Sequence, residues 1–173
     1  MNSLSVPSIF LGDSLVSRAE KEKYLGTLIS DKFLDNDDID REIRAIYARG
    51  NYLIRSFRRC DDNTKSVLFS TYCSNLYCSA LWSNYSNTVL QRLVVAYNNV
   101  FRKLFYVDRR ASVSFNMVFR NITHLKVILR KYSHNFMSRL FSLNNSIVIA
   151  LRNWADFPIS PFVINSYDIM HKS

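Results

Sequence analysis

The chain has 173 residues, of which 48% are hydrophobic, and its 23 Lys and Arg residues outnumber its 14 Asp and Glu residues. This length suits one compact domain of ordinary size and excludes a second full domain. Only three glycines and three prolines are present, and this scarcity favours helices joined by short turns over a β-sandwich or β-barrel.

A β-hairpin is predicted at the N-terminus, and a helix is predicted to follow it. Residues 8–16 and 23–30 have the pattern of two short strands, with the charged segment 17–22 as the turn between them. A lone hairpin is marginal in water, so we expect this one to pack on a larger sheet or on the helices. The helix is expected to run to about Arg59, with Asn36 as its cap and acidic residues complementing its dipole.

This first helix is predicted to have an apolar face and a basic face. At about 100° per residue, its apolar residues recur at three- and four-residue steps and form one stripe. The stripe consists of Ile39, Ile43, Ile46, Gly50, Leu53, Ile54 and Phe57. Arg41, Arg44, Arg55 and Arg59 fall near the opposite side, and Arg49 lies at one flank of that set. One face should therefore pack, and the other should offer guanidinium groups to a partner.

Further helices are predicted along the rest of the chain. Their expected ranges are 64–82, 88–105, 112–119, 123–143 and 146–154, after which prolines end the regular structure and a loose tail is expected. Short joints favour antiparallel neighbours. The predicted fold class is therefore mainly α: a β-hairpin in residues 1–32, an antiparallel three-helix bundle in residues 33–110 and a C-terminal helical extension in residues 111–173.

The positive charge is concentrated in the later part of the chain. Residues 1–62 hold 10 Lys and Arg against 11 Asp and Glu, whereas residues 63–173 hold 13 against 3. Such asymmetry favours an anionic partner, with nucleic acid first and an anionic membrane surface second. A basic, solvated surface without a partner is the alternative that charge alone leaves open.

The N-terminus and the cysteines indicate an intracellular protein of the nucleus or the cytoplasm. The first residues lack the basic and long apolar regions of a signal peptide. Residues 66–91 carry no charge, but Ser, Thr and Asn interrupt them repeatedly, so we expect a buried helix and no membrane span. Cys60, Cys73 and Cys78 have no paired metal spacing. An odd number of cysteines without a secretory signal indicates free thiols.

No catalytic centre, metal site or cofactor is expected. The acidic run Asp35–Asp40 lacks the central glycine and the terminal glutamate of an EF-hand loop, and its place at a helix start favours capping. His124, His134 and His171 show no ligand spacing with a cysteine or an acid. Most aromatic residues lie inside apolar stripes, which favours core positions over base stacking.

The order of several segments resembles one known family. KYLGTLIS at 23–30 is followed by DDIDREIRAIYARGNYLIRSFRRC at 37–60, VLFSTYCSNLYCSALWSNY at 67–85 and LQRLVVAYNNVFRKLF at 90–105. ASVSFNMVFRNITHLKVILRKYSHNFMSRL follows at 111–140. Together these segments resemble the region after the catalytic motifs of LINE-type (non-LTR retrotransposon) reverse transcriptases. The resemblance runs in order through about residues 8–150.

The resemblance implies a primer-grip hairpin followed by a thumb, the helical part that closes on the template–primer duplex. Tyr24, Leu25 and Gly26 match the primer grip. On the thumb-like helix, phosphate contacts are our inference from the basic face, and they would involve Arg41, Arg44, Arg49, Arg55 and Arg59. The expected partners are an RNA–DNA or DNA duplex and the missing palm and fingers of a larger polymerase.

The family's catalytic aspartates lie upstream of the primer grip, and this sequence begins after them. Because those carboxylates hold the two magnesium ions of polymerisation, we expect a catalytically incomplete fragment that binds template–primer without extending it. The alternatives are a non-functional remnant or a helical protein-interaction module. A third alternative is a basic protein on anionic membranes.

Overall fold

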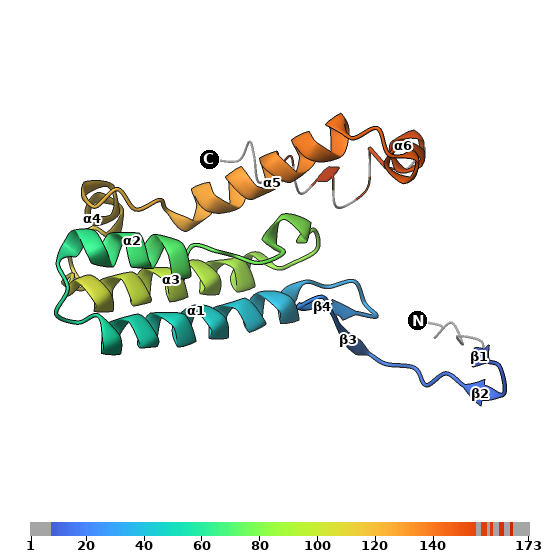
Figure 1. Ribbon diagram of the computed structural model, residues 1–173, viewed down its shortest axis with the longest axis horizontal. Helices are drawn as coiled ribbons and strands as arrows, with labels where there is room; N and C mark the ends of the chain where they lie inside the picture. The colour runs from blue at the N-terminus through green and yellow to red at the C-terminus, as the bar shows by residue number, and fades with distance from the viewer. Residues whose placement is uncertain (1–7, 155–156, 159, 161–162, 165–166, 168–173) are drawn as a thin grey trace.

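The computed structural model describes residues 8–154, 157–158, 160, 163–164 and 167, and it is mainly helical, as predicted (Figure 1). The strands are β1 (Phe10–Leu11), β2 (Ser14–Leu15), β3 (Lys21–Tyr24) and β4 (Thr27–Ser30). The helices are α1 (Asn36–Ser56), α2 (Asp62–Tyr72), the 3-10 helix η1 (Ser79–Leu81), α3 (Asn87–Phe105), α4 (Val113–Phe119), α5 (Leu125–Ser142) and α6 (Ser146–Asn153).

The N-terminal strands form two separate hairpins, so the prediction of one hairpin from residues 8–16 and 23–30 is wrong. β1 pairs with β2 around Gly12, whose φ of +61° lets the chain reverse inside the first predicted strand. β3 pairs with β4 around Leu25 and Gly26, whose φ values are also positive. The pattern of strand residues did not reveal the first turn, because a glycine inside a strand indicates a bulge equally well.

The helical body is built on α1 and α3, which lie side by side and run in the same direction, with the shorter α2 antiparallel to them (Figure 1). Gly50 of α1 lies against Val100 of α3: a Cβ added at Gly50 would stand 2.3 Å from a Val100 methyl carbon. The missing side chain therefore lets the two helices approach each other. Around this contact lies a buried core whose largest members include Tyr97, Phe69, Phe101, Ile39 and Ile46.

The chain leaves α2 well before Trp82, so the predicted helix over residues 64–82 is too long. Side chains from other elements donate hydrogen bonds to the backbone carbonyl groups of the loop that follows α2. The Tyr132 hydroxyl donates to the Ser74 carbonyl, and the Arg49 guanidinium donates to the Asn75 carbonyl, both at 3.3 Å. These tertiary hydrogen bonds satisfy the backbone outside a helix, and no local sequence pattern contains them.

The later helices agree with their predicted ranges to within one or two residues at each end. Ser86 caps α3 and Ser112 caps α4, because each hydroxyl accepts a backbone N–H of the first turn. The core that surrounds Gly50 continues into Met117 of α4 and Leu125 of α5. No helix in the described part of the chain is long and apolar enough to cross a membrane.

Two residues of the predicted loose tail are packed. Phe157 and Val163 are buried beside Met137 of α5, so the prediction is wrong for these two positions. Both side chains are apolar, and their burial against α5 stabilises this part of the chain. The prediction for residues 168–173 lies outside the described residues.

Candidate nucleic-acid interface

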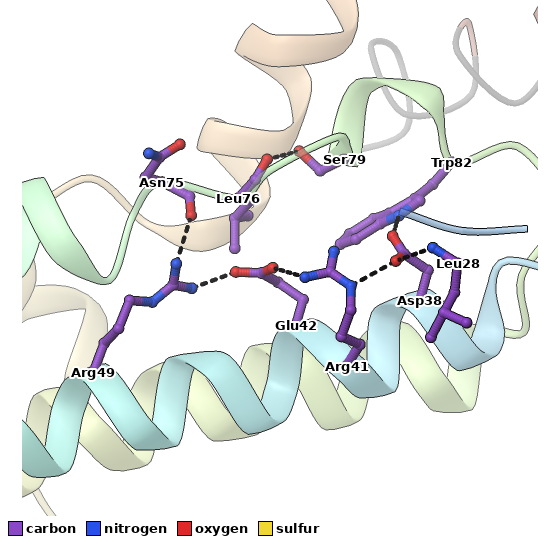
Figure 2. A network of polar contacts seen from close by, with 9 residues as sticks. All are labelled: Leu28, Asp38, Arg41, Glu42, Arg49, Asn75, Leu76, Ser79 and Trp82. Atoms are coloured by element: carbon purple, nitrogen blue, oxygen red, sulfur yellow. Dashed lines mark hydrogen bonds and ion pairs between the residues drawn. The ribbon is translucent and has the colours of Figure 1, made fainter. Parts of the chain in front are cut away.

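The acidic start of α1 is buried, and its carboxylates hold neighbouring segments together (Figure 2). Asp38 is fully buried and accepts hydrogen bonds from the Arg41 guanidinium (2.7 Å), the Leu28 N–H (3.0 Å) and the Trp82 indole N–H (2.9 Å). Burial by itself would raise the pKa of Asp38, but these hydrogen bonds, led by the one from Arg41, lower the pKa below its ordinary value. Asp38 therefore joins the β3–β4 hairpin, α1 and the end of η1.

Glu42 is buried one turn further along α1, between two arginines (Figure 2). It accepts from the Arg41 guanidinium at 3.3 Å and from the Arg49 guanidinium. Only 22% of the Arg41 side chain and 29% of the Arg49 side chain are exposed. The prediction that Arg41 faces outward is therefore wrong. A buried carboxylate without a cationic partner is costly, so both arginines turn toward the protein.

The predicted cap of α1 also has a different role. Asn36 accepts a hydrogen bond from the Ser86 N–H (3.0 Å), while the N-cap residue itself is Asp35, whose side chain makes no capping bond. The Asp35 carboxylate instead accepts the N–H groups of Ser83 and Asn84, each at 2.7 Å. Burial raises its pKa above the ordinary value, although the two hydrogen bonds act in the opposite direction. These residues connect the loop before α3 to the start of α1.

The residues predicted to form a primer grip lie at the turn between β3 and β4. Tyr24 and Leu25 are 63% and 73% exposed, and Leu25 and Gly26 have φ values of +46° and +86°. A positive φ is a strained conformation for leucine. The turn borders an open hollow of about 450 Å³ that is also lined by Phe33 and Tyr77. This end of the molecule therefore offers an apolar surface.

Cations gather at the opposite end of α1, where Arg55 and Arg59 are exposed. Arg58 donates to the Tyr106 hydroxyl at 3.1 Å, which joins the end of α1 to the end of α3. Because α1 and α3 run in the same direction, their C-terminal ends lie side by side (Figure 1). Basic residues of both ends and of the loop after α3 therefore belong to the same end of the molecule. We call this group of exposed cations the basic end, and it consists of Arg55, Arg58, Arg59, Lys103, Arg109 and Arg110.

The carboxylates near the basic end have other partners than its cationic side chains. Asp61 caps α2, and Asp62 pairs with Arg120 at 3.0 Å. Asp108 accepts the backbone N–H of Arg110 at 2.7 Å. Among the described residues, no side chain of the basic end forms an ion pair with a carboxylate. These cations are therefore available to an anionic ligand.

The predicted site residues thus fall into separate regions. Tyr24–Gly26 lie before α1 and Arg55 and Arg59 lie at its far end, about 30 Å away for a helix of 21 residues. Arg44 is exposed between them. Sequence reasoning missed four residues of the basic end: Arg58, Lys103, Arg109 and Arg110. The sequence does show basic residues near the ends of the first and third long helices. Whether these helix ends lie at the same end of the molecule depends on the relative direction of α1 and α3.

Among the described residues, no group of three or more His, Cys, Asp or Glu side chains could hold a metal ion. Comparison with known proteins identifies no relative, since no family model, curated protein or solved structure matches the chain. Function is therefore inferred from the residues and their arrangement.

Proposed function

We propose that this chain binds the phosphate backbone of nucleic acid through its basic end, without reading the base sequence. The observation that carries the proposal is a group of six exposed cations on the adjacent ends of α1 and α3 and in the loop after α3. Among the described residues, no carboxylate forms an ion pair with their side chains. Contacts of Lys and Arg with phosphates give affinity that is largely independent of sequence, because each contact releases counterions from the nucleic acid.

Helix stabilisation is a weaker explanation for the basic end. Cations near a helix C-terminus compensate the helix dipole, which is equivalent to roughly half an elementary charge at each end. Two helix ends thus need about one positive charge, whereas the basic end carries six cationic side chains. Three carboxylates lie nearby, those of Asp61, Asp62 and Asp108, and Asp62 is paired with Arg120, so the cations remain in excess. The excess positive charge favours an external anion, and a polyanion satisfies many cations at once.

The order of the sequence segments supports a more specific proposal. In a primer grip and thumb of a retrotransposon reverse transcriptase, the β3–β4 turn and the basic end would contact a template–primer duplex at two places, separated by the length of α1. The bond-forming step would belong to palm carboxylates outside this sequence. In a primer-extension assay, the purified chain should bind template–primer and add no nucleotide, and templated addition would contradict this assignment.

Salt dependence tests the binding proposal. Six phosphate contacts predict that log K for a duplex falls by about five units per tenfold rise in salt. Replacing Arg55, Arg58 and Arg59 together by Gln should reduce that slope by about three units and weaken binding to all duplex sequences alike. The measurement is a filter-binding or anisotropy titration at three or more salt concentrations, with an RNA–DNA hybrid and two unrelated DNA duplexes.

A charge-matched variant distinguishes the basic end from the net charge of the protein. Lys32, Lys131 and Arg139 are also exposed, but they lie away from the basic end. Replacing these three residues by Gln should leave most of the salt slope in place. An equal loss of affinity in both triple variants would mean that binding depends on the net charge of the protein and not on the basic end. An unchanged salt slope after replacement of Arg55, Arg58 and Arg59 would refute the proposal.

A different observation favours the second candidate, a protein-interaction module. The hollow beside the β3–β4 turn is bordered by Leu25 and Phe33, which are 73% and 79% exposed although both are apolar. Both have positive φ, a conformation that asparagine tolerates better. A Leu25→Asn/Phe33→Asn variant should therefore stay folded and self-associate less in analytical ultracentrifugation. Unchanged association would contradict an interaction surface at this hollow.

A further inference from the structure

Helix α4 has a second apolar face that the fold does not use. Phe115, Val118 and Phe119 are 70%, 74% and 75% exposed, and their i, i+3 and i+4 spacing places them on one face. The opposite face of α4 is packed on the core, because Met117 is 1% exposed and Val113 packs against the core residues. Burial of Met117 therefore anchors α4, while the two phenylalanine rings remain in water at a cost in free energy. Such rings suggest a ligand.

Exposed cations precede this face in the chain. Arg109 and Arg110 come before α4 and are exposed. Arg120 follows α4, with its guanidinium carbon 5.8 Å from the centre of the Phe119 ring, and its charge is paired with Asp62 at 3.0 Å. The sequence contains no Asp or Glu between Asp108 and Asp156. An apolar partner alone would not explain this charge, and a purely anionic partner would not explain the exposed rings. The ligand should combine flat apolar surfaces with negative charge.

We propose that α4 binds unpaired nucleotides, with bases stacked on Phe115 and Phe119 and phosphates held by Arg109 and Arg110. Every base has a π-face that can stack on an aromatic ring, so this mode requires no particular sequence. In a duplex, the neighbouring base pairs cover those faces. The inference rests on the proposed nucleic-acid binding and deepens it. It assigns unpaired nucleotides to α4 together with Arg109 and Arg110 of the basic end, and it leaves the duplex backbone to Arg55, Arg58, Arg59 and Lys103.

The test compares three ligands that differ in whether base faces are accessible. Fluorescence anisotropy would be measured with an oligothymidylate of about 12 nucleotides, an abasic strand of equal length and a duplex hairpin. The parent protein should bind the oligothymidylate more tightly than the abasic strand. A Phe115→Ala/Phe119→Ala variant should lose at least about tenfold in affinity for the oligothymidylate, since one stacked base corresponds to roughly five- to 150-fold in affinity. Its affinity for the abasic strand should not change.

A matched control removes two other exposed rings. Phe10 and Trp154 are 62% and 55% exposed. Phe10 belongs to β1 and Trp154 directly follows α6, and both elements lie at the end of the molecule far from α4 (Figure 1). A Phe10→Ala/Trp154→Ala variant should bind the oligothymidylate as the parent does. Circular-dichroism melting of both double variants checks that the fold survives, as expected for exposed positions.

The possible outcomes separate this inference from the broader proposal. If the Phe115→Ala/Phe119→Ala variant binds oligothymidylate as tightly as the parent, while loss of Arg55, Arg58 and Arg59 still weakens duplex binding, only the α4 assignment is overturned. Equal affinity of the parent for the abasic and normal strands overturns it as well. If none of the arginine replacements affects binding to any ligand, both the proposed function and the α4 site fail.

Discussion

Replacing Glu42 by Gln should destabilise the protein without affecting nucleic-acid binding. Glu42 is 1% exposed and is the shared acceptor of Arg41 and Arg49 (Figure 2). A glutamine has nearly the same shape, but it carries no charge and presents an amide N–H₂ to one of the two guanidinium groups. The substitution therefore leaves Arg49 without a carboxylate partner, whereas Arg41 keeps its ion pair with Asp38.

The expected loss follows from the burial of the three side chains. Removing one partner of a buried ion pair costs about 3–5 kcal/mol. Because 22% of Arg41 and 29% of Arg49 remain exposed, water partly screens their charges, so the loss should lie near the lower limit, about 3 kcal/mol. For a domain of this size, that loss corresponds to a fall in Tm of roughly 6–12 °C.

Urea denaturation followed by circular dichroism measures this loss, and Asp40→Asn supplies the control. Asp40 lies on the same helix, but its partner Arg92 is 57% exposed and 3.1 Å away, so the control should lose less than about 1 kcal/mol. Both variants should keep the parent's salt slope in duplex binding. A loss below about 1 kcal/mol for Glu42→Gln, or a changed slope, would refute the assignment of Arg41 and Arg49 to an internal network.

Three further predictions concern the core and the buried polar groups. Gly50→Ala should lower the free energy of unfolding by roughly 2 kcal/mol, because its Cβ meets both Val100 methyl groups, and Val100→Ala in that background should recover part of the loss in urea denaturation. Burial raises the pKa of Cys73 to about 12, so iodoacetamide at neutral pH should label the other two cysteines first and Cys73 only after unfolding, as mass spectrometry can show. Because the pKa of Asp38 is lowered, its charged form stabilises the fold at pH values above the ordinary pKa of 3.8, and this stabilisation is lost as the pH falls through the lowered pKa. Asp38→Asn should therefore reduce the fall of the free energy of unfolding at acidic pH.

Apolar periodicity determined most of the helical framework. The stripe through Ile39, Ile46 and Leu53 predicted the core face of α1, and these residues are buried. Ser and Asn residues before α3, α4 and α6 accept backbone N–H groups of the first turn. Caps and amphipathic stripes depend on residues close together in the sequence, so the sequence by itself contains the information for them.

Periodicity could not determine which polar residues of α1 are buried. Asp38, Glu42 and Arg49 lie beside the apolar stripe, and a single helix offers no reason to bury them. Their partners Trp82 and Asn75 come from a distant loop, which itself was predicted to be helical. Once that loop folds over α1, each buried carboxylate requires a cation and a buried N–H requires an acceptor.

The candidate interface required the tertiary structure for a similar reason. The sequence by itself showed an excess of positive charge after residue 62 and arginines on the first helix. It could not show that the end of α1, with Arg55 and Arg58, lies beside the end of α3, with Lys103, since about 50 residues separate them in the chain. That arrangement follows from the parallel packing of α1 and α3, which the close contact of Gly50 with Val100 allows. Net charge is a property of composition, whereas a binding surface depends on which helix ends the packed core brings together.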